Sequence, residues 1–265
     1  MNEPRFARLQ QSLEQGFTLT PKAIFQEAWQ RIQGAKMPIL LATVGVVGCW
    51  LLLNQLLMTV GGEGEEASWN LSLLGLLISM IMAPMSGGLD MMGVHRSVDR
   101  PIRPNQIFDY FRYLLPLALA SMLMGIISSL FLPLGQSLGL PPMVSMLPTL
   151  ILSVALMFTF PLILEKGLSP VQAIITSLRL FARQWLMLLS IHLMLMLLFM
   201  GAVLTFGIGL VWVAPLYIVV KGILYREACG VEGMPEDQQA PAVNGPLNGS
   251  PNNSKDNSPK DRFDA

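Results

Sequence analysis

The chain has 265 residues, of which 52% are hydrophobic and 13% are charged, and its 17 basic and 17 acidic residues cancel to a formal net charge of zero. Soluble domains carry about 25% charged residues, so this composition is that of a membrane protein and excludes an ordinary soluble domain. Two distant cysteines, Cys49 and Cys229, predict no disulfide framework.

Residues 1–36 are predicted to form a cytoplasmic, amphipathic N-terminal region without a cleavable signal peptide, because they lack an apolar core segment. The stretch "RFARLQQSLEQGF" predicts a surface helix that ends near Gly16. The stretch "TPKAIFQEAWQRI" predicts a second one, with Pro21 in its first turn, where the missing N–H costs nothing. Glu27 and Arg31 are spaced as an i,i+4 ion pair on its polar face.

Six apolar segments follow, each close to the roughly 20 residues that cross the hydrocarbon core of a bilayer. They cover residues 37–60, 69–94, 113–134, 142–164, 185–204 and 208–225. Only "TFG" separates the last two, which predicts a tight hairpin. The predicted fold class is therefore all-α: a polytopic membrane protein whose six transmembrane helices occupy a domain over residues 37–229.

The basic residues predict the orientation of these segments. All 17 lie before the first segment, between the second and third, between the fourth and fifth, or from Lys221 onward. The opposite loops carry none, so the positive-inside rule places both termini in the cytoplasm. Residues 230–265 contain almost no large apolar side chains and predict a disordered cytoplasmic tail.

Three cytoplasmic stretches share a pattern that begins with proline: "TPKAIFQEAWQRI", "RPNQIFDYFRYL" and "SPVQAIITSLRLF". The pattern predicts three transmembrane hairpins, each preceded by an amphipathic interfacial helix. Whether the three units are a true internal repeat stays open. In the third stretch the apolar face consists of Val171, Ile174, Ile175, Leu178 and Phe181, and the polar face of Gln172, Thr176, Arg179 and Arg183. We expect the apolar face to meet lipid or the bundle, and the arginines to meet water or anionic headgroups.

Part of the sequence around this third stretch resembles a known family. An apolar segment ends in "PLILEKG", an A-x-x-x-S helix follows with Ala173 and Ser177, and arginine and tryptophan lead into the next segment. In this it resembles the YciC-like proteins, a bacterial inner-membrane family of unknown function. The same layout occurs in the membrane domain attached to some glycerophosphodiester phosphodiesterases. The resemblance covers residues 18–228 in layout, implies six spans and a bacterial inner-membrane location, and transfers no catalytic residue.

Asp90 is the most suggestive polar residue, and with Arg96 and Lys221 it forms a candidate functional or structural polar site. An acidic residue inside a membrane segment is by default a functional-site hypothesis. The structural alternative is an ion pair, because Asp90 lies about two turns from the cytoplasmic end, within reach of Arg96 or Lys221.

A helix break is expected just before this acid, at Pro84, Gly87 and Gly88. Broken helices mark the binding sites of many transporters. The alternative is that the glycines let neighbouring helices approach closely, as small residues do in bilayers.

Enzymatic and metal-binding functions are not expected. The sequence contains no Walker loop, no H-E-x-x-H, no nucleophile elbow and no Cys/His ligand cluster. His192 is interpreted as a hydrogen-bonded packing residue. The 18 methionines could in principle bind Cu(I) through their thioethers, but they are scattered over several segments and are interpreted as packing residues. No catalytic residue, cofactor, metal or nucleic-acid partner is predicted, and the oligomeric state is not predicted.

The expected function is that of a non-enzymatic factor that organises the membrane or envelope, or that is the membrane partner of another protein. The expected partners are the lipid bilayer and a cytoplasmic or membrane protein. In this hypothesis the interfacial helix carries the interaction, through Ile174, Leu178, Arg179, Phe181 and Arg183. The alternative is a transporter or permease subunit with its polar site near Asp90.

Overall fold

The computed structural model describes residues 6–16, 20–60, 65–139 and 141–231, and this part of the chain is helical and contains no strand. The all-α class predicted from the sequence is therefore confirmed for the described residues. The predicted disordered tail, residues 230–265, lies almost entirely outside them, and its disorder stays a prediction.

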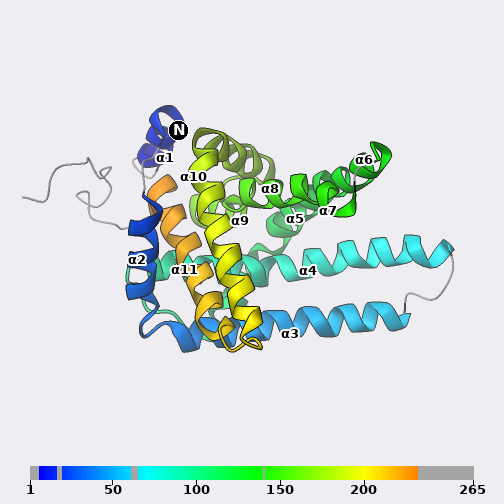
Figure 1. Cartoon of the computed structure of the whole chain (residues 1–265), viewed down its shortest axis with the longest axis horizontal. Helices are drawn as coiled ribbons and strands as arrows, with labels where there is room; N and C mark the ends of the chain where they lie inside the picture. Colours follow the sequence, from blue (N-terminus) through cyan, green and yellow to red (C-terminus); the bar gives the residue numbers. More distant parts are fainter. Residues whose placement is uncertain (1–5, 17–19, 61–64, 140, 232–265) are drawn as a thin grey trace, which may run out of the picture.

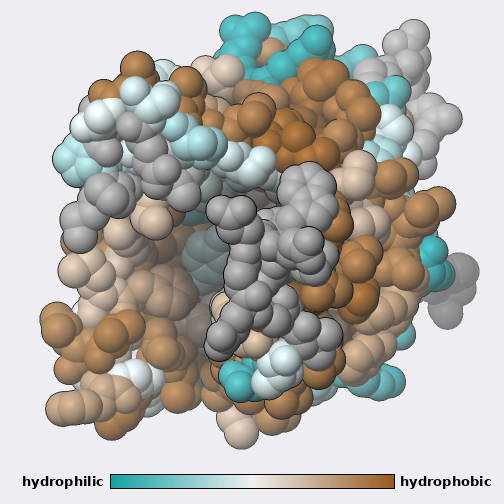
Figure 2. Space-filling model, turned by 90° about the vertical axis from the view of Figure 1, so that its right-hand side faces the viewer, coloured by the Kyte–Doolittle hydropathy of each residue, from teal (hydrophilic) through white to brown (hydrophobic). Residues whose placement is uncertain are grey.

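Five helical segments of the described chain are long and apolar enough to cross a membrane. They are Lys36–Thr59, Leu73–Ser97, Pro104–Gly135, Leu147–Lys166 and Pro170–Leu204. The sixth expected segment, now α11 (Leu210–Cys229), is not among them, because Lys221, Arg226 and Glu227 place three charges in its C-terminal half. Five such segments indicate a membrane protein, and hydrophobic residues cover much of the face shown in Figure 2.

Four helices form the first part of the fold: α1 (Ala7–Gln15), α2 (Pro21–Ile32), α3 (Lys36–Val60) and α4 (Glu65–Ser97). The helix end expected near Gly16 and the proline start at Pro21 are both confirmed. α3 and α4 lie side by side as a hairpin that reaches away from the other helices (Figure 1). α1 and α2 lie at the opposite end of the molecule, beside α11.

α4 is one continuous helix, so the break expected at Pro84, Gly87 and Gly88 is wrong. A proline inside a membrane helix is tolerated because neighbouring groups and small backbone adjustments re-satisfy the freed carbonyl. The glycines instead admit close neighbours. A Cβ atom on Gly88 would lie only 2.7 Å from the Cα of Ile107, and one on Gly87 would lie 3.1 Å from a methyl carbon of Leu164. The alternative considered for these glycines, close packing, is what the structure contains.

The middle of the chain is less regular than predicted. It consists of η2 (Pro104–Tyr113), α5 (Leu114–Ser129), α6 (Phe131–Ser137), α7 (Pro142–Ser145), α8 (Leu147–Ala155) and α9 (Thr159–Lys166). The second amphipathic stretch forms the 3₁₀ helix η2 and not an α-helix, but it still buries one side, through Ile107 and Tyr110. The predicted fourth membrane segment is divided into α7, α8 and α9.

The division between α8 and α9 has a cause in the sequence. Pro161 has no N–H to donate to the carbonyl of Met157, and its ring clashes with that carbonyl, so the helix opens over residues 156–158. Ser177 satisfies the freed backbone: its Oγ donates to the carbonyl of Ala155 at 2.6 Å and accepts from the N–H of Phe158 at 3.3 Å. The serine of the A-x-x-x-S pattern therefore fastens the next helix to this opening.

Local caps close the turn into α10 (Pro170–Leu204). Gly167 adopts the left-handed conformation, with φ of 67°, and ends α9. Ser169 is the N-cap of α10 and forms a reciprocal capping box with Gln172. Thr20, at the start of α2, forms no such side-chain cap bond.

α10 bends at Gln184, whose φ and ψ of −133° and 33° are not helical. The bend separates a first part, residues 170–183, from a second part, residues 185–204, as expected for an interfacial helix followed by a membrane segment. The second part lies beside α11, and the two run across α3 and α4 (Figure 1). This arrangement differs from a simple bundle in which all hairpins are aligned.

Candidate functional site

The candidate polar site is a buried ion pair between α4 and α11. The Nζ atom of Lys221 lies 2.7 Å and 2.8 Å from the two carboxylate oxygens of Asp90. The two side chains are only 15% and 7% exposed, respectively. Of the two partners considered for Asp90, the structure brings Lys221 to it. Arg96 lies elsewhere and donates to the backbone carbonyls of Arg31 and Gln33.

The ion pair sits beside a point of backbone contact between the two helices. Gly93 lies one turn after Asp90, and Gly222 follows Lys221 directly. A Cβ atom on Gly222 would lie 2.1 Å from the carbonyl group of Gly93, so the two backbones are in direct contact. Small residues permit such contact between membrane helices. The pair therefore links α4 to α11 at a fixed point of the fold.

A second polar cluster lies at the cytoplasmic ends predicted for α4 and α11. Arg226 binds both carboxylate oxygens of Glu27 in α2, at 2.6 Å and 3.0 Å, in the bidentate geometry that favours arginine. It also donates to the carbonyl of Ser97 at 2.6 Å. The predicted i,i+4 pair between Glu27 and Arg31 is present at 2.7 Å, and Arg31 reaches Asp99 at 2.6 Å. α2 is thus tied to the ends of both α4 and α11.

α1 is attached to the same end of α11. The guanidinium group of Arg8 binds a carboxylate oxygen of Glu227 at 2.6 Å and the backbone carbonyl of the same residue at 3.0 Å. The N-terminal helices are therefore held by specific ion pairs as well as by their apolar faces, of which Ile24 and Ala28 are fully buried.

The ionisation of Glu27 reflects this cluster. Burial alone would raise the pKa of its carboxyl group, but the hydrogen bonds and charges of Arg226 and Arg31 outweigh burial. The net pKa lies below the ordinary value of 4.5. Glu27 is therefore a stable anion at neutral pH, and it holds two cations together.

The first part of α10 has one buried side and a broad exposed one. Ala173, Ile174, Ser177 and Leu180 are buried against the bundle. Val171, Ile175 and Leu178 are exposed, and so are Arg179 and Arg183. The predicted apolar face is therefore only partly buried: Ile174 lies against the bundle, whereas Leu178, one turn further on, is 37% exposed. Phe181 is half-buried.

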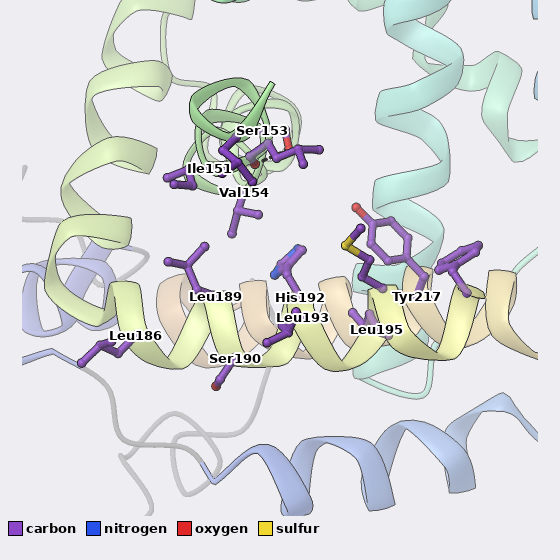
Figure 3. Close-up of a pocket in the computed structure, with 14 residues that line it drawn as sticks. Ile151, Ser153, Val154, Leu186, Leu189, Ser190, His192, Leu193, Leu195 and Tyr217 are labelled. Carbon is purple, nitrogen blue, oxygen red and sulfur yellow. Dashed lines mark hydrogen bonds between the residues drawn. The ribbon is translucent and has the colours of Figure 1, made fainter. Parts of the chain in front are cut away.

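An apolar groove of about 630 Å³ lies between α8, the second part of α10, and α11 (Figure 3). Ile151 and Val154 face it from α8, Leu189 and Leu193 from α10, and Tyr217 from α11. His192 projects into the same space. Its Nδ1 atom lies 2.9 Å from the carbonyl of Leu188, and its ring meets the edge of Tyr217. The sequence did not predict this groove, because its residues come from three separate segments.

A second cavity, of about 750 Å³, lies between α2, the second part of α10, and α11. Trp29, Gln26 and Lys22 line it from α2, and Trp212 and Leu198 line it from the last two helices. Neither of these two cavities is lined by Asp90 or Lys221.

Comparisons of the chain with protein-family models, with curated proteins and with solved structures found no match. The resemblance to the YciC-like proteins accordingly stays a prediction from the sequence.

Proposed function

We propose that the chain is a non-enzymatic factor of a bacterial inner membrane, which organises that membrane or serves as the membrane partner of another protein. In this proposal six segments cross the bilayer as three hairpins, and both termini are cytoplasmic. The five long apolar segments and the one-sided distribution of the basic residues support this topology. α11 has 20 residues, and its charges gather in its C-terminal half, where they can reach the cytoplasmic interface.

The buried ion pair between Asp90 and Lys221 is the main observation that supports a role other than transport. Both carboxylate oxygens bind one ammonium group, and both side chains are nearly inaccessible. A transport site needs an acid that solute or water can reach. Breaking a buried pair is strongly destabilising, by about 3–5 kcal/mol, because it leaves an uncompensated charge. We therefore assign the pair to holding α4 and α11 together.

In this proposal the exposed side of the first part of α10 is the surface that contacts the membrane interface or a partner protein. Three apolar side chains, Val171, Ile175 and Leu178, lie there next to Arg179 and Arg183. An apolar strip beside cations is the composition of a helix that lies in a membrane interface. The same strip can contact the apolar surface of a partner protein.

The test replaces the three apolar residues Val171, Ile175 and Leu178 by alanine. Proteins and lipids that copurify with the full chain after gentle solubilisation are quantified for the variant and for the wild type. We expect the variant to keep its abundance and to lose at least one partner. The matched control replaces the exposed residues Leu115, Leu119 and Ile126 of α5 by alanine, and it should keep the wild-type profile.

An unchanged profile in the α10 variant would refute the role of this surface. The transporter alternative makes a different prediction for cells that produce a variant of Asp90. If Asp90→Asn keeps wild-type abundance and thermal stability but abolishes an uptake or efflux phenotype, the ion pair belongs to a transport path and the proposed role is wrong.

A further inference from the structure

The apolar groove between α8 and the second part of α10 is best suited to an apolar ligand. Its serines already bond to their own helices: Ser153 donates to the carbonyl of Leu150 at 2.7 Å, and Ser190 to that of Met187 at 2.8 Å. His192 likewise has its Nδ1 atom 2.9 Å from the carbonyl of Leu188 in its own helix. A polar solute would therefore lose its hydration and gain few hydrogen bonds in return.

The groove is large enough for a ligand and has an exposed side. Its volume of about 630 Å³ lies within the roughly 300–1,000 Å³ of ordinary small-molecule sites. Several of its lining residues are also half exposed, among them Leu150, Ile151 and Leu193. In a membrane segment that exposure faces acyl chains, so an acyl chain can enter from the side.

One end of the groove lies at the bend of α10. Leu186, which lines the groove, is in the first turn after Gln184 (Figure 3). The exposed Trp185 lies beside it, and tryptophan favours the boundary between lipid and water. Arg179 and Arg183 precede the bend, and their i,i+4 spacing puts them on one side of the helix.

These two arginines place positive charge at that boundary. Both are exposed, and within the described part of the chain no carboxylate forms an ion pair with either of them. The cytoplasmic leaflet contains anionic lipids, which attract basic residues near its surface. A phosphate headgroup is therefore the complementary charge for this end of the groove.

We propose that this region is a binding site for one anionic phospholipid. One acyl chain lies in the groove between α8 and the second part of α10, and the phosphate headgroup binds Arg179 and Arg183 at the bend. This inference rests on the membrane location in the proposed function, and it adds a specific ligand to it.

The headgroup contacts are tested on the purified full chain by native mass spectrometry. The protein in detergent is titrated with phosphatidylglycerol or with phosphatidylethanolamine of identical acyl chains. Each cation is worth about fivefold, so we expect the wild type to prefer the anionic lipid by up to roughly thirtyfold. The double variant Arg179→Gln and Arg183→Gln should bind the two lipids about equally. A preference that survives this double change would overturn the headgroup assignment.

The groove is tested by filling it. Ser153→Phe places a ring in the groove, at an exposed position of α8. Ser129→Phe is the matched control, because Ser129 is also exposed and bonds only to its own helix, but lies outside the groove. We expect Ser153→Phe to weaken the binding of both lipids about tenfold or more. This is the loss of affinity expected when about two methylene groups of the acyl chain are no longer buried. Equal binding by the two variants would overturn the acyl-chain site.

The outcome is separable from that of the proposed function. Lipid binding is measured on isolated protein and needs no cellular partner. If the alanine variant at Val171, Ile175 and Leu178 keeps every copurifying partner while Ser153→Phe loses lipid, the partner role fails and the lipid site stands. If instead the alanine variant loses a partner while Ser153→Phe binds lipid as the wild type does, the proposed function stands and only the lipid site is wrong.

Discussion

Gly93 and Gly222 bring α4 and α11 into backbone contact, beside the buried ion pair. The space that a Cβ atom on Gly222 would need is already taken by the carbonyl group of Gly93, 2.1 Å away. A carbonyl group in a helix cannot rotate aside as a side chain can. The close crossing therefore requires glycine at position 222, because the methyl group of an alanine there would collide with the Gly93 carbonyl.

Gly222→Ala should destabilise the protein, because the helices must separate to admit the methyl group. Overpacking of this kind costs about 1–3 kcal/mol, and the separation also lengthens the nearby ion pair. The measurement is the midpoint of thermal unfolding in detergent. Gly45→Ala in α3 is the control, since its Cβ would meet nothing within 4 Å. Equal midpoints for the two variants would contradict the close crossing.

Ser177→Ala should also lower stability, because it leaves the carbonyl of Ala155 and the N–H of Phe158 without their partner inside the bundle. A buried group left unsatisfied costs about 1–3 kcal/mol. Ser190→Ala removes an exposed hydroxyl that bonds only to its own helix, and it should have little effect. A smaller loss in Ser177→Ala than in Ser190→Ala would show that the opening after α8 does not need the serine.

Local signals in the sequence predicted the elements that depend on neighbouring residues. The helix start at Pro21 and the ion pair of Glu27 with Arg31 both involve residues within four positions of each other, and both are present. The break predicted at Pro84 was wrong because it does not depend on neighbouring residues alone. Proline weakens a helix locally, but contacts with distant segments decide whether the helix opens. α4 stays continuous through Pro84, whereas the chain opens between α8 and α9, just before Pro161.

The pH dependence of stability should carry a contribution from Glu27. Its pKa is below 4.5 in the folded protein because Arg226 and Arg31 outweigh the effect of burial. The anion is thus favoured by folding, and the resulting stability is fully present above pH 4.5 and is lost as the pH falls through the folded pKa. Unfolding midpoints between pH 7 and pH 3 measure it.

Glu27→Gln should lower the midpoint at pH 7 and flatten its decline below pH 4.5. The exposed Glu14 provides the control, because Glu14→Gln should keep the wild-type profile. A Glu27→Gln variant as stable as the wild type at pH 7, with the same acid decline, would contradict the role of the cluster.

The candidate site could be predicted only in part. Asp90 and Lys221 were both singled out as charges in apolar segments, and the need to neutralise them pointed to a pair, although 131 positions separate them. The bidentate contact of Arg226 with Glu27 joins residues 199 positions apart, and no periodicity within one helix could reveal it. The groove was missed for the same reason, since it exists only where α8, α10 and α11 meet.

The central claim is that Asp90 and Lys221 hold the fold together and do not conduct a solute. Its most direct test compares thermal unfolding in detergent for Asp90→Leu, Lys221→Met and the double variant. Each single change strands a buried charge and should cost about 3–5 kcal/mol, whereas an apolar pair should restore most of that loss. Two stable single variants, or a double variant no better than either, would contradict the claim.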